Sequence, residues 1–284
     1  MIRLYLNGGF GNQLFQYATA RALSLKHKTK LEIDLRFYDL SVHNTSKAPW
    51  IKDLSIVGSF KTYNNTWPSP HSRLRRGFEK IFFDRLRHVH IEPDLGFHEQ
   101  VLALGRNCVL IGLFQSYRYF DSIWPTMARE FDISNFSDRA WLSDCARDGR
   151  AWAAMHVRRG DYVGDDRFEM RSPEIYYTSA MRRLRNADPD TRFVVFSDNI
   201  EWCRRQHWLD GCEFYSRSFP SHPAADMATM AQATHNVIAN SSYSWWSAWL
   251  GQRPGKVVVM PAVWVDQRRT IDIDLAPAGW TVLS

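Results

Sequence analysis

The fold of this chain is decided by AWAAMHVRRGDYV, residues 151–163. A mostly apolar run, 151–157, is followed at once by two arginines, a glycine and an aspartate. Short apolar runs that end in polar residues are typical of buried strands in parallel sheets. Ligand-binding loops of α/β proteins follow the carboxyl ends of such strands. We therefore expect the two arginines to lie at the ligand-binding edge of an α/β sheet.

Similar apolar runs follow this stretch and alternate with helical patterns. Strands are expected at 193–196, 212–215, 236–239 and 257–260, and helices at 174–186, 200–207, 224–234 and 242–250. Alternation of short strands with helices favours a parallel sheet that is covered by helices on both faces. Residues 146–284 are therefore predicted to form a Rossmann-like domain.

The first half of the chain follows the same pattern less regularly. Strands are expected at 2–6, 31–34 and 109–114, helices at 12–26 and 122–131, and loops over 39–70. The polar stretch at 135–149 suits a crossover between domains. The sequence thus predicts an α/β protein with two Rossmann-like domains, 1–145 and 146–284, which face each other across a cleft. Loops of both domains would bind ligands there.

Composition and charge exclude several classes of protein. The 284 residues are 45% hydrophobic and 23% charged, as in globular proteins, and no apolar run is long enough for a membrane-spanning helix. The N-terminus reads as a strand and not as a signal peptide, and the four cysteines lack the spacing of zinc or redox motifs. A cytoplasmic protein is expected. The net charge of +6 suits nucleic acid, an anionic membrane or a phosphorylated ligand, and equally a basic soluble surface.

Residues 71–90 carry a basic amphipathic pattern that has two interpretations. Apolar positions between 74 and 89 fall on one helical face, and arginines and a lysine surround that face. Such a helix can lie on an anionic bilayer, which would place the protein peripherally at the inner face of the plasma membrane. It can equally be a packed surface helix with solvated arginines.

The motif at 156–163 offers groups that suit phosphate. Arg158 and Arg159 bring permanently charged guanidinium groups, which match phosphate oxygens bidentately. Gly160 allows close approach of the backbone, and Asp161 can hold one arginine in place. A surface turn closed by salt bridges would show the same residues.

Three further motifs follow predicted strands. NSSYSWWSAWL at 240–250 begins a helix whose hydroxyls and N–H groups can bind an anion or simply cap the helix. GGFGNQLFQYA at 8–18 is a strand–turn–helix unit without the glycine spacing of a dinucleotide fold or the lysine of a P-loop. FSDN at 196–199 places Asp198 where it can accept hydrogen bonds from guanine or ribose, or cap a helix.

Together these motifs resemble glycosyltransferase family 11, the α-1,2-fucosyltransferases of bacterial surface-glycan assembly. The matching stretches are GGFGNQLFQYA at 8–18, HVRRGDYV at 156–163, FSDN at 196–199 and DMATMAQATHNVIANSSYSWWSAWL at 226–250. They stand in the family's order, although the family commonly has Arg-Leu where this chain has Gly9-Phe10. The resemblance implies a GT-B fold, GDP-fucose as donor substrate and no metal cofactor.

The resemblance also implies roles for individual residues. Arg158 would contact the β-phosphate, His156 and Asp198 would face the guanine, and Asn12 would reach the donor from the first domain. The phosphates would be lined by Ser241, Ser242 and Tyr243. The implied reaction is inverting transfer of L-fucose to the 2-hydroxyl of a galactose-like residue, on a free or lipid-linked glycan of O-antigen or another surface polysaccharide.

Several alternatives stay open at this point. Arg158 and Asp161 are the expected catalytic residues, but Asp166 is a second candidate for the general base, and a loose oxocarbenium-like transition state needs little base. Asp165-Asp166 and Asp188-Pro189-Asp190 resemble metal-binding carboxylates only superficially, because both lie in expected loops. An α-1,6 transferase and a non-catalytic sugar-binding module are alternatives, whereas nucleic-acid binding lacks a recognition motif. Acceptor contacts are expected from residues 36–70 and 92–107.

Overall fold

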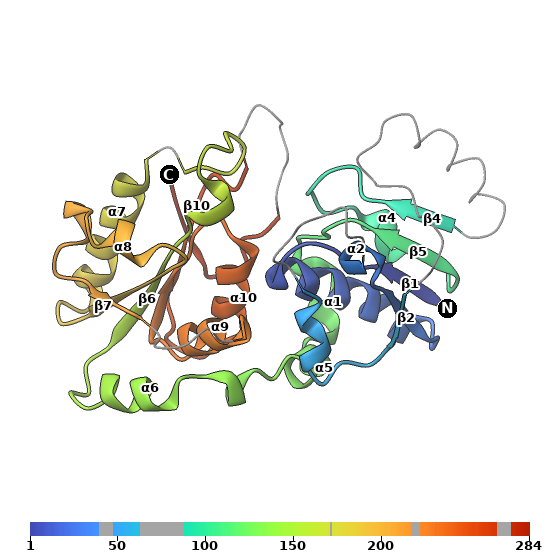
Figure 1. Cartoon of the computed structure of the whole chain (residues 1–284), viewed down its shortest axis with the longest axis horizontal. Helices are drawn as coiled ribbons and strands as arrows, with labels where there is room; N and C mark the ends of the chain where they lie inside the picture. Colours follow the sequence, from blue (N-terminus) through green and yellow to red (C-terminus); the bar gives the residue numbers. More distant parts are fainter. Residues whose placement is uncertain (40–47, 63–87, 171, 217–221, 266–273) are drawn as a thin grey trace. The chain divides into compact units, whose positions relative to one another are not determined.

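The computed structural model describes residues 1–39, 48–62, 88–170, 172–216, 222–265 and 274–284. The chain divides into two compact units, Met1–Asp132 with Ile271–Leu275 (unit 1) and Ile133–Thr270 with Ala276–Ser284 (unit 2). Each unit contains its own sheet of parallel strands with helices packed on it (Figure 1). The predicted fold class, α/β with two Rossmann-like domains of the GT-B type, is confirmed. The cleft between them stays a prediction.

The boundary between the units differs from the predicted one after residue 145. Helix α6 (Arg139–Cys145) belongs to unit 2 because its N-cap residue, Asp138, donates its backbone N–H to Thr229 Oγ1 at 3.0 Å. Trp141 of the same helix packs edge-on against Trp152, with ring centroids 5.2 Å apart. The polar stretch that reads as a linker therefore contains a helix of the second unit.

Unit 1 is built on a five-stranded parallel sheet with the order β3-β2-β1-β5-β4. Its strands are β1 (Ile2–Tyr5), β2 (Leu31–Asp34), β3 (Ser59–Lys61), β4 (His88–Ile91) and β5 (Cys108–Ile111). Its helices are α1 (Phe10–Lys26), α2 (Arg36–Asp39), α4 (Glu99–Leu102) and α5 (Trp124–Glu130). From β1 the strands follow outward through β2 to β3, the next strand, β4, lies at the opposite edge, and β5 then lies beside β1. This reversal is a topological switch point, where α/β sheets bind ligands.

Two sequence predictions for unit 1 need correction or fall outside the described residues. Most of the amphipathic pattern, 71–87, lies outside the described residues, but 88–91 forms strand β4 and not the end of a helix. The reason is pairing, because Val89 and Ile91 lie beside Val109 and Ile111 of β5. Strand β5 also ends at Ile111, earlier than predicted.

Unit 2 is built on a six-stranded parallel sheet with the order β11-β10-β9-β6-β7-β8. Its strands are β6 (Trp152–Val157), β7 (Arg192–Ser197), β8 (Glu213–Phe214), β9 (His235–Val237), β10 (Val258–Pro261) and β11 (Thr281–Leu283). Besides α6, its helices are α7 (Pro173–Ala187), α8 (Ile200–Cys203), α9 (Ala224–Ala231) and α10 (Ser242–Leu250). Every strand except β11 was expected from the sequence. Here the chain order reverses between β6 and β9.

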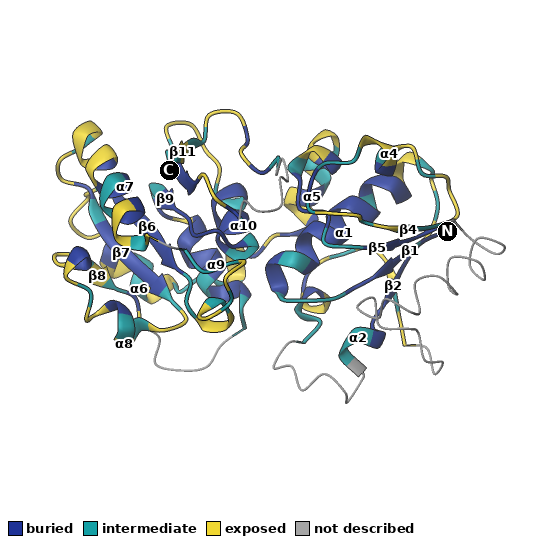
Figure 2. Ribbon diagram, turned by 90° about the horizontal axis from the view of Figure 1, so that it is seen from above, coloured by how far each residue is buried: buried dark blue, intermediate teal, exposed yellow. Residues whose placement is uncertain are grey.

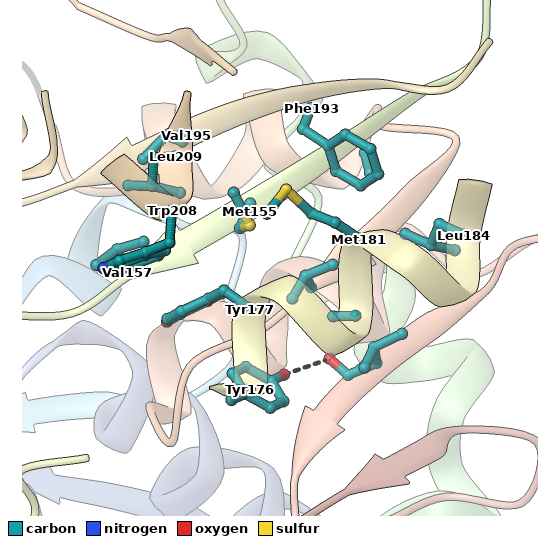
Figure 3. Packing of buried hydrophobic residues seen from close by; sticks show 14 of the residues in the cluster. Met155, Val157, Tyr176, Tyr177, Met181, Leu184, Phe193, Val195, Trp208 and Leu209 are labelled. Atoms are coloured by element: carbon teal, nitrogen blue, oxygen red, sulfur yellow. Dashed lines mark hydrogen bonds between the residues drawn. The ribbon is translucent and has the colours of Figure 1, made fainter. Parts of the chain in front are cut away.

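Helices cover both faces of the unit 2 sheet. On one face, Tyr176, Tyr177 and Met181 of α7 pack against Met155 and Val157 of β6 (Figure 3). On the other face, the buried cluster joins side chains of α6 and α9 to alternate residues of β6 and β7. The central strands are therefore buried, whereas α6 and α7 are exposed on their outer sides (Figure 2). This packing leaves the carboxyl edge of the sheet, with its loops, as the place where polar side chains gather.

Candidate active site

The loops after β6, β7 and β9 meet at the switch point of unit 2. These three strands are neighbours in the sheet, and His156 pairs with Phe196 while Met155 pairs with Val237. The motifs that follow the three strands therefore lie at one edge. The structure thus brings the predicted site residues of the second half of the chain to one region.

Arg158 is held between two carboxylates at this edge. Its Nη1 lies 2.7 Å from Asp198 Oδ2, and its Nη2 donates to Asp161 Oδ1 at 2.5 Å. Burial lowers the pKa of Arg158, but the two carboxylates more than offset this, so the pKa lies above its ordinary value. The guanidinium is therefore charged and fixed in direction. Its remaining N–H groups can serve an anionic ligand.

Asp198 organises the arginine loop with both of its oxygens. While Oδ2 pairs with Arg158, Oδ1 accepts the backbone N–H of Arg159 at 2.8 Å. A Cβ atom at Gly160 would lie 2.4 Å from Asp198 Oδ2, so this contact requires a glycine there. These contacts give Asp198 a positioning role toward Arg158. Its predicted contact with guanine stays a prediction.

The two adjacent arginines have different partners, which their sequence does not reveal. The Arg159 guanidinium lies 4.0 Å from the centroid of the Trp202 ring, and its Nη1 is 3.6 Å from Glu169 Oε1. Trp202 belongs to the short helix α8 and packs on the α7 side of the sheet. Arg159 therefore ties the loop to the domain, whereas Arg158 is held by two loop carboxylates and the nearby Tyr162 ring, and is the better phosphate ligand.

His156 is a buried, neutral imidazole beside the arginine. It is 5% exposed, and burial and then the charge of Arg158 lower its pKa to about 4. Its ring lies 5.7 Å from the Tyr243 ring, and its Nδ1 has no hydrogen-bond partner within the described structure. Tyr243 is itself fixed, since its Oη accepts the backbone N–H of Met227 at 3.0 Å. A neutral imidazole can present either a donor or an acceptor to a nucleobase.

The N-terminus of helix α10 adds a second anion-binding element. Ser241 is the N-cap residue, but its side chain makes no capping hydrogen bond, and Ser242 begins the helix. The first backbone N–H groups of a helix have no partner within it and carry partial positive charge. They attract phosphate oxygens. The three tryptophans further along α10 are buried, as expected for core residues.

Asn12, the predicted donor ligand of the first half, lies at the switch point of unit 1. It stands in the first turn of α1, and its Oδ1 accepts a hydrogen bond from Gln115 Nε2 at 2.8 Å. Gln115 follows strand β5, so this bond joins the two loops that flank the switch point. Asn12's contact with the donor stays a prediction.

Asn240 is a site residue that sequence reasoning missed. Its Nδ2 donates to the carbonyl of Phe168 at 2.7 Å and to that of Trp264 at 3.2 Å, and its backbone carbonyl accepts from Tyr162 Oη at 3.2 Å. One side chain thus ties together the loops after β6, β9 and β10. In the sequence, this asparagine stands directly before the paired serines of the 240–250 motif, and that position could have indicated its role.

The carboxylates that resembled a metal site have other partners. Asp165 pairs with Arg167 at 2.6 Å, and Asp188 accepts the N–H of Asp190 at 3.1 Å in a turn. In the part of the chain that the structure describes, no group of three or more His, Cys, Asp and Glu side chains could hold a metal ion. No described helix is both long and apolar enough to cross a membrane.

Comparison with known proteins identifies the family. The model of "Glycosyl transferase family 11" matches residues 100–284. The chain belongs to glycosyltransferase family 11. It is 30% identical to the alpha-1,2-colitosyltransferase of Escherichia coli, over 97% of this chain and 96% of that protein. It is 28% identical to the O-antigen biosynthesis glycosyltransferase WbnK of Escherichia coli, over 91% and 93%. It is 26% identical to the galactoside 2-alpha-L-fucosyltransferase Sec1 of Mus musculus, over 88% and 64%.

The family match includes the whole arginine site. Residues 100–284 contain Arg158, its two carboxylates and the start of α10, so the cluster belongs to the part that defines the family. The resemblance expected from the motifs is confirmed, and this family 11 protein is a glycosyltransferase. A transferase of this kind must bind an activated sugar and stabilise its leaving group, and the charged edge of unit 2 has the chemistry for both.

Proposed function

We propose that this family 11 glycosyltransferase transfers L-fucose from GDP-fucose, with inversion, to the 2-hydroxyl of a galactose-like residue. The observation that carries the proposal is Arg158, held by Asp161 and Asp198 beside the first turn of α10. Relatives named for α-1,2 and galactoside 2-α transfer support the linkage, and the O-antigen relative supports a surface polysaccharide as product.

Leaving-group stabilisation is the main task of the site in this proposal. Negative charge grows on the β-phosphate as the bond between sugar and phosphate breaks. Arg158 and the first backbone N–H groups of α10, which begins at Ser242, are already oriented, so they stabilise that charge without reorganisation. His156, neutral and beside Tyr243, would read the edge of the guanine.

The acceptor hydroxyl must lose a proton during transfer. Asp161 is the proposed catalytic carboxylate, because its pairing with Arg158 places it next to the departing phosphate. Asp166, four residues after the end of the short helical turn that begins at Gly160, is the alternative base. Unit 1 is proposed to bind the acceptor, a galactose-containing oligosaccharide that is free or lipid-linked.

The decisive experiment incubates the purified protein with GDP-fucose and a panel of galactosides, followed by linkage analysis of the product. An α-1,2-linked fucoside is expected. Hydrolysis of GDP-fucose without transfer to any acceptor, or an α-1,6 product, would contradict the proposal. Activated colitose should be tested in parallel, because the colitosyltransferase relative favours it as a second candidate donor.

The same assay tests the proposed independence from metal ions. We expect excess EDTA to leave the rate unchanged, because the cationic groups at this edge, Arg158 and the start of α10, can take the place of a metal. A complete loss of activity that Mn²⁺ restores would show that the leaving group needs a cation which these residues do not supply.

A further inference from the structure

A mostly apolar cavity of about 260 Å³ lies in unit 2 next to the arginine site. Its wall comes from the loops after β6, β9 and β10, from the start of α7 and from the end of β11. The apolar part of the wall includes Phe168, Met170, Ile175, Val263, Trp264 and Leu283. Polar groups of the same cavity come from Asp166, Arg167, Glu169 and Ser172, among others. We call it the β10 cavity.

The β10 cavity is held open by hydrogen bonds that do not involve a ligand. Asn240 is 6% exposed, and its side-chain amide binds the backbone of both Phe168 and Trp264, one from each facing loop. On the α7 side, Tyr176 Oη donates to the carbonyl of Ile238 at 2.7 Å. Because these groups are buried and paired, the cavity has its shape before any ligand arrives.

The mouth of the β10 cavity exposes apolar side chains to solvent. Ile175 is 60% exposed and Val263 is 45% exposed, although both line the cavity. An apolar hollow with an exposed apolar rim and a few polar groups is the usual composition of a small-ligand site. Its walls suit a ligand with an apolar face and a limited number of hydroxyl groups.

The β10 cavity is next to a smaller pocket that Arg158 lines. The two share wall residues, Glu169, Met170 and Asn240, and Asn240 directly precedes Ser241 at the start of α10. The sugar of a nucleotide sugar is joined to the β-phosphate through one oxygen atom. A sugar whose phosphate lies on Arg158 and α10 must therefore lie within a few atoms of Asn240.

The guanine and the sugar of such a donor would lie toward opposite faces of the sheet. Val157 packs in the buried cluster on the α7 side of the sheet. Because neighbouring residues of a strand point to opposite faces, His156 points to the other face, toward Tyr243. With the guanine near His156 and the diphosphate over the edge of the sheet, the sugar extends to the α7 side. The β10 cavity opens on that side.

We propose that the β10 cavity binds the 6-deoxyhexose of the donor, with the methyl group on C5 against the apolar wall. The proposal rests on the proposed function, and it adds the feature that selects the sugar. L-Fucose differs from L-galactose only in this methyl group, which replaces a hydroxymethyl group. A hydroxyl placed behind Val263, against the buried Trp264, would lose its hydrogen bonds to water without replacement. Asp166 is placed to accept from ring hydroxyls.

The test compares three probes, GDP, GDP-L-fucose and GDP-L-galactose, by isothermal titration against the full chain. Wild type should bind GDP-L-fucose more tightly than GDP-L-galactose, by about tenfold to a hundredfold, since apolar pockets reject an added hydroxyl to about that extent. Val263→Trp fills the cavity and should remove the preference for GDP-L-fucose, while its affinity for GDP is unchanged. Val263→Ser should reduce the discrimination between the two sugars.

Val282→Trp is the matched control. Val282 is 46% exposed, as Val263 is, but it points away from the β10 cavity because Leu283, its neighbour in β11, lines it. This variant should bind all three probes like wild type, and thermal melts should show that both tryptophan variants are folded.

The outcomes separate this proposal from the proposed function. If Val263→Trp is folded and binds GDP-L-fucose as tightly as wild type does, the sugar lies elsewhere and the proposal is wrong. The same conclusion follows if wild type binds the two sugar nucleotides equally. If wild type binds none of the three probes, the proposed donor is wrong, and the failure belongs to the proposed function.

Discussion

The two sheets of this protein are both parallel and both reverse their strand order beside their first strand, but the chemistry at these two switch points differs. In unit 2, the loops after β6 and β7 place Arg158 between two carboxylates. In unit 1, neutral groups bond the elements beside the switch point, and Asp34 at the end of β2 is already paired with Arg36 in a buried ion pair. Gln115 binds Asn12, and Gln13 Nε2 donates to the carbonyl of Gly8 at 3.1 Å and to Tyr38 Oη at 2.9 Å.

This difference teaches that topology decides where a ligand binds and side chains decide which ligand it is. A charged, preoriented arginine suits a diphosphate whose charge grows during the reaction. Amides and tyrosine hydroxyls suit a ligand that is rich in hydroxyl groups. The comparison therefore supports a donor site in unit 2 and an acceptor site in unit 1. Substitutions at either edge can test it.

The largest effect is expected from Arg158→Ala. Removal of one preoriented donor to a developing anion typically lowers kcat by about 10²–10³, and Arg158 is charged and bidentate. Arg158→Lys should not restore the rate, because lysine keeps the charge but loses the planar pair of donors. Steady-state kinetics with GDP-fucose and thermal melts should be measured together.

Arg150→Ala is the control for this experiment. Arg150 precedes β6, at the opposite edge of the sheet from Arg158, and pairs with Asp148 at 2.8 Å. Its loss should leave kcat unchanged. If Arg158→Ala keeps its melting temperature and more than about a tenth of the wild-type kcat, the leaving-group role of Arg158 is wrong, because loss of such a donor should cost far more.

A smaller effect, about a tenfold loss of kcat, is expected from Asp198→Asn. The amide oxygen can still accept the N–H of Arg159, whereas the charge that orients Arg158 is gone. Because the lost interaction acts through Arg158, kcat should fall more than KM rises. A higher KM with unchanged kcat would instead favour the contact with guanine that the family resemblance implies.

Much of the fold and of the charged edge could be predicted from the sequence. Strand β2 and helix α10 have the predicted bounds, because their apolar patterns end at clear polar or glycine signals. The arginine motif was expected at a strand end, and it follows β6 directly. These features depend on local pattern, which a single sequence contains.

The remainder depends on contacts between distant residues. Strands β3 and β11 are three residues long and lie at sheet edges, so only their pairing defines them. Arg158 and Arg159 are adjacent and identical in type, and only the positions of Asp198 and Trp202 distinguish them. Asn240 acts through backbone groups of two other loops, which leave no residue signature in the sequence.

In unit 1, Asn12→Ala tests whether the neutral edge contributes to donor binding. Loss of one neutral hydrogen bond is worth about 0.5–1.5 kcal/mol, so the affinity for GDP-fucose should fall about two- to tenfold. Gln115→Leu removes the group that fixes Asn12 and should give a weaker change in the same direction. Isothermal titration checks both. Unchanged donor affinity in the two variants would restrict unit 1 to the acceptor.

The last contrast concerns stability and not catalysis or binding, and its expected dependence on pH is opposite in the two units. In unit 1, burial raises the pKa of Glu92 from 4.5 to about 7, although the N–H groups of Leu113 and Phe114 act against this. The folded state therefore binds the proton more strongly, and the stabilisation is lost as the pH rises to about 7. In unit 2, burial lowers the pKa of His156 from 6.5 to about 4, so its stabilisation is lost as the pH falls from 6.5 to about 4.

Thermal melts of wild type, Glu92→Gln and His156→Gln between pH 4 and pH 8 test this contrast. One unit of pKa shift corresponds to about 1.4 kcal/mol, which is about 3–6 °C in melting temperature for domains of roughly 150–250 residues. The melting temperature of wild type relative to Glu92→Gln should decrease as the pH rises, because only wild type carries the titrating carboxyl. Relative to His156→Gln it should decrease as the pH falls. If both differences in melting temperature change in the same direction with pH, these buried groups do not titrate as their surroundings require. The electrostatic contrast between the units would then lose this support.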